Sequence, residues 1–122
     1  MSDGDERLKR RKAWRRGHVS EYLAALFLLA KGYRILAIRH RTRLGEIDII
    51  ARKGDLAVFV EVKARRLERE AIDAVSFSAQ KRIRGASDLW LVRQPDYALL
   101  SQRYDIVAIL PGRWPRHFQD AF

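Results

Sequence analysis

The sequence contains no cysteine, which excludes disulfide bonds, zinc–thiolate sites and thiol-based catalysis. It has only three histidines, His18, His40 and His117, and their wide separation excludes a local histidine metal motif. Long apolar runs are also missing. The longest, Tyr22 to Ala30, has nine residues, about half of what a membrane helix needs. Since no signal peptide is visible either, we expect a cytoplasmic protein without membrane attachment.

Acidic residues are in the minority, because 25 Lys and Arg stand against 15 Asp and Glu and give a net charge of +10. This excess favours a polyanionic partner such as nucleic acid, although an acidic membrane surface or a ribosome would also attract it. Residues 1–16 hold seven Lys and Arg against three acids. We expect a flexible basic arm there, which either engages phosphates or only solubilises the chain. Residues 17–122 are long enough for one domain with a modest core.

The stretch from Gly45 to Lys63 alternates charged and apolar residues on both sides of a turn-like Gly54-Asp55. Such alternation is typical of strands with one buried face, and it predicts a tight hairpin. Residues whose numbers sum to 109 then face each other across the hairpin. In this register Asp48 faces Glu61.

The same register places Glu46 opposite Lys63, with Glu46 and Asp48 on one face and Ile47 and Ile49 on the other. Directly opposed carboxylates repel each other, so they need a proton or a cation between them. Mg²⁺ is typically held by one or two carboxylates, waters and substrate phosphates. We therefore favour a divalent metal site over a solvated hairpin whose outer face carries these charges by chance.

A helix is predicted over residues 17–31, with Gly32 as the residue that ends it. It is apolar nearly all round from Tyr22 to Ala30, so we expect most of its surface to be buried. Glu21 lies in its first turns, where the helix dipole favours an acid. Its alternative role is to point at the same cation as the hairpin acids.

The remaining pattern predicts a strand over residues 33–40, a basic connection into the hairpin and a helix over residues 78–92. A buried strand follows over residues 104–110, and the chain closes with a final strand or packing tail. This order predicts an α/β layer with a mixed sheet. Several basic residues near the hairpin and on the second helix are either phosphate contacts or ordinary surface charges. They are Arg39, Arg41, Arg43, Lys81 and Arg84.

The element order and the D…E-x-K pattern resemble the PD-(D/E)XK nuclease superfamily, which has the restriction-endonuclease-like fold. More specifically, the chain resembles the bacterial YraN-like family, itself similar to archaeal Holliday-junction resolvases. The resemblance covers residues 17–122. It rests on Gly17, Glu21, Gly32-Tyr33, Ile35-Leu36, Gly45-Glu46-Ile47-Asp48, Phe59-Val60-Glu61-Val62-Lys63, Gln80, Tyr104-Asp105 and Ala121-Phe122.

This resemblance implies a central mixed β-sheet flanked by helices and a metal-dependent endonuclease that hydrolyses phosphodiester bonds of DNA, including branched repair or recombination intermediates. Asp48 and Glu61 match the two motif acids and Glu21 the helix acid, all ligands of Mg²⁺ or Mn²⁺. Lys63 matches the motif lysine and Gln80 the helix glutamine. A resolvase-like role implies a symmetric homodimer. The alternative is a nucleic-acid-binding protein that keeps the fold without the chemistry.

His40 and Ala64 depart from the family pattern, which usually has asparagine and threonine at these positions. Neither change removes a predicted ligand, but either could alter how a substrate is positioned.

Overall fold

The computed structural model describes the backbone of residues 3–122 and the side chains of residues 4–11 and 18–122. Part of the predicted basic arm, namely residues 1–2 and the side chains of residues 12–17, therefore lies outside the described residues. The elements follow in the order α1 (Asp3–Ala30), β1 (Arg34–Thr42), β2 (Gly45–Lys53), β3 (Leu56–Ala64), α2 (Glu68–Asp73), α3 (Phe77–Leu91), η1 (Tyr97–Leu99), β4 (Ser101–Ile109) and β5 (Arg116–Phe118).

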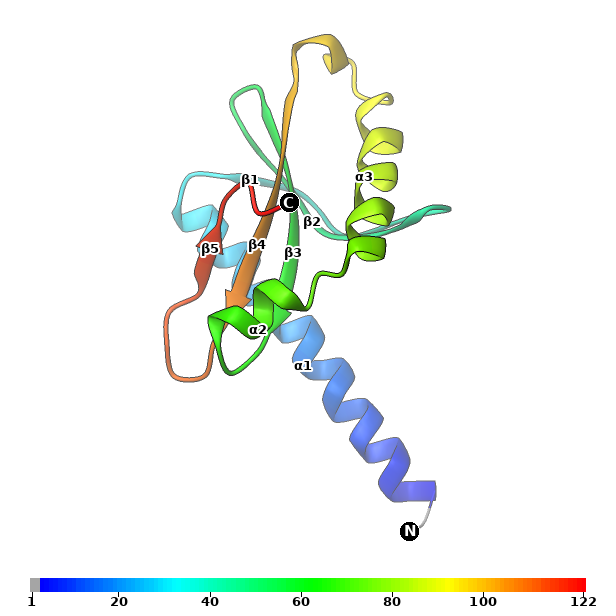
Figure 1. Ribbon diagram of the computed structural model, residues 1–122, viewed down its shortest axis with the longest axis vertical. Helices are drawn as coiled ribbons and strands as arrows, with labels where there is room; N and C mark the ends of the chain where they lie inside the picture. Colours follow the sequence, from blue (N-terminus) through cyan, green and yellow to red (C-terminus); the bar gives the residue numbers. More distant parts are fainter. Residues whose placement is uncertain (1–2) are drawn as a thin grey trace.

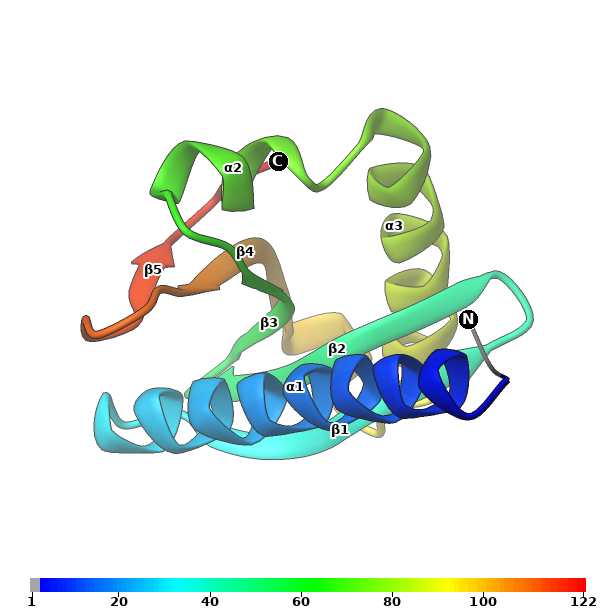
Figure 2. The same ribbon diagram turned by 90° about the horizontal axis from the view of Figure 1, so that it is seen from below.

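The five strands form one sheet in the order β1-β2-β3-β4-β5. Only β3 and β4 are parallel, because the chain crosses over through α2 and α3 between them. Helix α1 covers one face of the sheet, and α2 and α3 lie over the other face (Figures 1 and 2). The predicted mixed sheet flanked by helices is confirmed, and the architecture agrees with a restriction-endonuclease-like fold.

The central hairpin has the predicted register near its turn. The pairs from Ile49↔Val60 to Lys53↔Leu56 all sum to 109. Gly54 closes the turn with φ of +60°, a left-handed conformation that glycine adopts without a steric penalty.

Helix α1 begins at Asp3, so the predicted start at residue 17 is wrong and the basic segment continues the helix. Its N-terminal half extends past the sheet (Figure 1). The predicted end is confirmed. Gly32 has φ of +93°, and the Tyr33 N–H donates to the Leu28 carbonyl at 3.0 Å, as in a glycine-terminated helix. The division into an arm over residues 1–16 and a domain over residues 17–122 stays a prediction.

The expectation that α1 is buried nearly all round is wrong. Ala24, Ala25 and Leu28 face the sheet and are buried, but Leu26 on the opposite side is 63% exposed. A helix that packs on one face of a sheet buries one stripe only, and no helix or strand of the described chain covers the other side of α1 (Figure 2). In the described part of the chain, no helix is long and apolar enough to cross a membrane.

The second predicted helix is confirmed as α3. Ser76 caps it by accepting a hydrogen bond from the Ala79 N–H at 3.2 Å. Its predicted stripe packs against the sheet, with Ile83 and Ala86 buried and Ala79 and Trp90 partly buried. This cluster anchors α3 over the β2 side of the sheet.

Both predictions for the end of the chain are also met. The strand expected over residues 104–110 is β4, which begins three residues earlier at Ser101. The terminal segment forms the short strand β5 and then packs the Phe122 ring 5.5 Å from the Tyr104 ring.

Candidate metal and nucleic-acid site

Asp48 on β2 and Glu61 on β3 come together where these two strands separate. Their backbone ladder ends at the Ile49–Val60 pair, so the predicted direct pairing of Asp48 with Glu61 is wrong. Instead the Asp48 carboxylate accepts the Val62 N–H at 2.8 Å and contacts the Glu61 side chain. The two acids still meet where the strands separate. There the Val62 N–H has the Asp48 carboxylate, and not a carbonyl of β2, as its acceptor, and this places Asp48 beside Glu61.

A residue of β1 with an unusual backbone conformation lies opposite Asp48. Arg39, which the register places opposite Asp48, has φ of +54°, and strand pairing skips this position. The alternation of β2 changes there. Ile47 packs in the core under α3, whereas Ile49 packs in the core under α1. The prediction that Ile47 and Ile49 share a face is therefore wrong, because regular alternation does not continue through a left-handed residue in the neighbouring strand.

Glu61 is a buried acid with an unsatisfied oxygen. The residue is 7% exposed, and its Oε1 atom has no hydrogen-bond partner among the residues whose side chains the structure describes. Burial, followed by the negative charge of Asp48, raises the pKa of Glu61 to about 8. Burial likewise raises the pKa of Asp48. At neutral pH this pair retains a proton that a cation could replace.

Lys63 supplies positive charge at this site. It is half-buried on β3, and its charge favours the ionised forms of both Asp48 and Glu61. Glu46 does not pair with Lys63 as predicted, because the β2–β3 ladder ends at Ile49–Val60. It is opposite Arg41 in the β1–β2 pair, and its carboxylate accepts a hydrogen bond from Arg41 Nε at 3.2 Å.

Glu21 on α1 lies at the edge of the acid pair. It is close enough to Asp48 for their negative charges to repel. Its carboxylate accepts a 2.6 Å hydrogen bond from Arg39. Burial raises the pKa of Glu21, and the Arg39 bond offsets part of this increase. The left-handed residue that redirects β2 thus also holds the third candidate acid.

The donor set suits a cation held by two carboxylates. Among the described residues, no group of three or more His, Cys, Asp or Glu side chains has the arrangement of a metal site. Mg²⁺ needs only one or two protein carboxylates, because waters and phosphates complete its octahedron. The free Oε1 of Glu61 beside Asp48 fits that requirement. Glu21 does not complete the set while Arg39 binds it.

Gln80 is placed in the first turn of α3, where its side-chain amide donates to the Val75 carbonyl at 3.2 Å. This bond fixes the backbone just before the N-terminus of α3. The structure provides no contact that brings Gln80 to the acid pair among the described residues, so its predicted catalytic role stays a prediction.

The predicted phosphate-binding residues divide into two groups. Arg39 is bound to Glu21, and the Arg84 guanidinium lies 4.6 Å from the Tyr104 ring centre. Arg43 and Lys81 are exposed, as is Arg41 with its ion pair to Glu46. The second group is the more available for a polyanion.

A groove of about 370 Å³ lies between the β1–β2 hairpin and the C-terminal half of α3. It combines basic side chains with an indole ring, a combination found where proteins bind single-stranded nucleic acid. The sequence reasoning missed the α3 side of this groove. Its lining residues are His40, Arg41, Thr42, Arg43, Leu89, Trp90, Arg93 and Gln94.

A second buried acid, Asp105 on β4, was not predicted as part of any cluster. Its carboxylate accepts two hydrogen bonds from Arg103 at 2.8 and 2.7 Å, one from His117 Nε2 at 2.7 Å and one from the Asp120 N–H at 3.0 Å. Lys31 Nζ donates to His117 Nδ1 at 2.6 Å. The available signal was an acid inside an apolar strand, which requires a buried partner.

The family model and the similar sequences all indicate the same protein family. Residues 20–109 match the model of "Uncharacterised protein family UPF0102". A UPF0102 protein from Rhizobium johnstonii is 76% identical over 122 residues and aligns over 100% of both chains. One from Sinorhizobium medicae is 67% identical over 111 residues, 91% of each chain, and one from Agrobacterium fabrum is 66% identical over 114 residues, 93% of each chain.

Proposed function

This chain belongs to the UPF0102 family, and from the chemistry of its acid pair we propose that it is a metal-dependent endonuclease that hydrolyses phosphodiester bonds of DNA. The observation that carries the proposal is the buried, unsatisfied Oε1 atom of Glu61 beside Asp48. Burying an acid oxygen without a hydrogen-bond partner costs stability, and functional sites are where such costs are commonly found.

Asp48 and Glu61 would hold Mg²⁺ or Mn²⁺, with Glu21 able to join only after release from Arg39. When bound, such an ion polarises the scissile phosphate and acidifies a water molecule. The protein's own residues orient the reaction. The Val62 N–H fixes the Asp48 carboxylate, and the Lys63 ammonium provides positive charge where negative charge develops on the phosphate.

The basic groove beside α3 supports a nucleic-acid substrate. Arg41, Arg43 and Arg93 would bind phosphates, and Trp90 offers a ring on which an unpaired base could stack. A net charge of +10 strengthens association with any polyanion. Such contacts grip the backbone with little sequence readout, so we expect structure-selective rather than sequence-selective cleavage.

The test is cleavage of labelled duplex, single-stranded and four-way-junction DNA with Mg²⁺, Mn²⁺ or EDTA. We expect metal-dependent cutting that falls at least about 100-fold in Asp48→Asn, Glu61→Gln and Lys63→Met, because each removes a group from the reacting centre. Glu46→Gln is the matched control, since it removes an exposed acid two residues from Asp48 and should retain activity.

Binding measurements separate this proposal from a non-catalytic role. The acid variants should bind DNA as tightly as the unmodified protein or more tightly, because a negative charge has been removed. DNA binding that is insensitive to EDTA, without cleavage of any substrate, would instead support the nucleic-acid-binding alternative.

A further inference from the structure

Helix α1 has an apolar surface on the side that faces away from the sheet. No Asp, Glu, Lys or Arg occurs between Tyr22 and Ala30. The exposed face of a surface helix normally carries charged residues, so this region differs from an ordinary solvated helix. We call this surface the α1 apolar face. It consists of Val19, Tyr22, Leu23, Leu26, Leu29 and the neighbouring Trp114.

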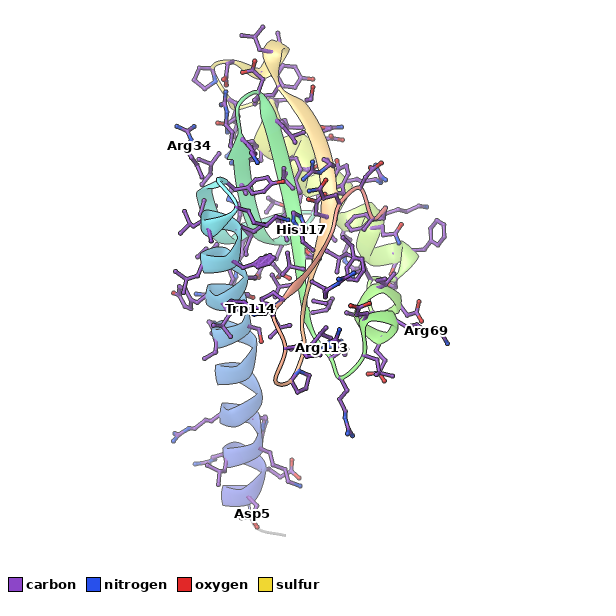
Figure 3. The ribbon with its side chains drawn as sticks, turned by 90° about the vertical axis from the view of Figure 1, so that its left-hand side faces the viewer. Asp5, Arg34, Arg69, Arg113, Trp114 and His117 are labelled. Atoms are coloured by element: carbon purple, nitrogen blue, oxygen red, sulfur yellow. The ribbon has the colours of Figure 1, made fainter. Side chains whose placement is uncertain are left out.

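Trp114 makes this face uneven. It lies in the connection between β4 and β5, is 87% exposed, and is placed beside the C-terminal half of α1 (Figure 3). Between this connection and α1 lies a groove of about 630 Å³, to which Leu26, Phe27 and Pro115 contribute. A projecting indole and an apolar groove therefore lie next to each other on one surface.

We infer that the α1 apolar face binds a second copy of this chain, with the two α1 helices antiparallel across a two-fold axis near Leu26. A two-fold interface requires a self-complementary surface, and a projection beside a groove satisfies this requirement. Each Trp114 would then contact the groove of the other copy. This inference does not depend on the proposed nuclease activity.

The size of the face agrees with a dimer. Its six side chains expose an area on the order of 700 Å², close to the roughly 800 Å² that each partner contributes to a standard interface. Isolated monomers rarely expose an apolar patch larger than a few hundred Å². An area of this size favours a stable contact over an incidental one.

The charge pattern of the face favours an apolar occupant. None of its six side chains is charged. The nearest cations lie at the groove, where Lys31 contacts His117 at 2.6 Å and Arg113 contacts Glu68 at 3.7 Å. In an antiparallel pair, the basic N-terminal segments lie at opposite ends, so the repulsion between two chains of charge +10 is reduced.

Sedimentation velocity of the full chain at micromolar concentration tests the inference. We expect a dimer, and we expect Leu26→Glu to weaken association at least about tenfold because it places a charge at the centre of the interface. Leu99→Glu is the matched control. Leu99 is 69% exposed on η1, and its substitution should leave the dimer intact.

Cysteine crosslinking tests the orientation, since the chain has no cysteine of its own. With copper phenanthroline as oxidant, Leu26→Cys should form a disulfide with its copy. Val19→Cys should not, because seven residues on each side of the axis separate the two positions by about 20 Å. Equal crosslinking at both positions would contradict the antiparallel pair.

Other outcomes would overturn the proposal. A monomer at all concentrations, or a dimer unaffected by Leu26→Glu, excludes this face as the interface. Anionic phospholipid vesicles provide a further comparison. A monomeric chain that binds them through Leu26 would have a lipid surface as its occupant, not a second copy.

Discussion

Glu61 on β3 and Asp105 on β4 are buried acids on adjacent parallel strands, but their surroundings differ. Asp105 is fully buried and accepts hydrogen bonds from Arg103, His117 and the backbone of Asp120. Burial alone would raise the pKa of Asp105, but these bonds outweigh it and lower the pKa. For Glu61, burial and Asp48 together raise the pKa to about 8.

The contrast separates an acid that holds the fold from an acid available for another ligand. The Asp105 cluster connects the end of α1 with β4 and β5, through Lys31, His117 and Arg103. Both oxygens of the Asp105 carboxylate already accept hydrogen bonds, so neither is free to bind a ligand. The Asp48–Glu61 pair instead retains an unsatisfied oxygen at the opening of a hairpin. Similar burial thus supports opposite interpretations, and hydrogen-bond partners decide between them.

The largest expected effect on stability is that of Asp105→Asn. It should lower the free energy of unfolding by about 3–5 kcal/mol, because it leaves Arg103 without its buried counter-charge and weakens the hydrogen bond from His117. Denaturant titration measures the change. Asp96→Asn is the control, since Asp96 also binds an arginine, Arg52 at 2.6 Å, but in a more exposed position. Comparable losses in both variants would show that burial of the Asp105 cluster contributes nothing.

Glu61→Gln should have the opposite effect and raise the free energy of unfolding. The folded chain holds the Glu61 proton up to a pKa of about 8, whereas the unfolded chain releases it near 4.5. Between these values the folded state binds more protons, so stability falls as the pH rises. In EDTA, we expect Glu61→Gln to stabilise the chain at pH 8 by on the order of 3 kcal/mol and to have little effect at pH 4.

Urea titrations across this pH range measure the difference between Glu61→Gln and the unmodified chain. Parallel pH profiles for the two proteins would show that Glu61 is not an uncompensated acid. Mg²⁺ provides a second readout, because a ligand that binds only the folded state raises stability. That increase should occur in the unmodified chain and be lost in Glu61→Gln.

The sequence predicted the parts of this contrast that depend on local pattern. Alternation and the Gly54 turn were sufficient for the hairpin and for the meeting of Asp48 with Glu61. The alternation of charged and apolar residues gave a wrong prediction where the backbone of a neighbouring strand is irregular. Nothing in the residue types of β1 indicates that Arg39 is left-handed, and that residue breaks the alternation of β2. The predicted backbone pairs Glu46–Lys63 and Asp48–Glu61 were wrong, because the β2–β3 ladder ends at Ile49–Val60.

Long-range contacts explain the other errors. Asp105 meets His117 only because β5 pairs with β4 after a turn, and Lys31 joins them from the end of α1. The apolar run of α1 predicted burial, since composition cannot distinguish a helix covered on two sides from one whose second side is exposed at Leu26. Tertiary layers decide which of two apolar faces is covered.

Glu21 is the intermediate case, and its substitution should have the smallest effect. It has one counter-charge, Arg39 at 2.6 Å, yet burial still raises its pKa. Glu21→Gln should change the free energy of unfolding by at most about 1 kcal/mol, because loss of a partly exposed ion pair is offset by relief of burial and of repulsion from Asp48. Mn²⁺ affinity, measured by calorimetry, should fall only a few-fold, whereas Glu61→Gln should abolish binding. A complete loss of Mn²⁺ binding in Glu21→Gln would mean that the metal displaces Arg39 and that all three acids act as ligands.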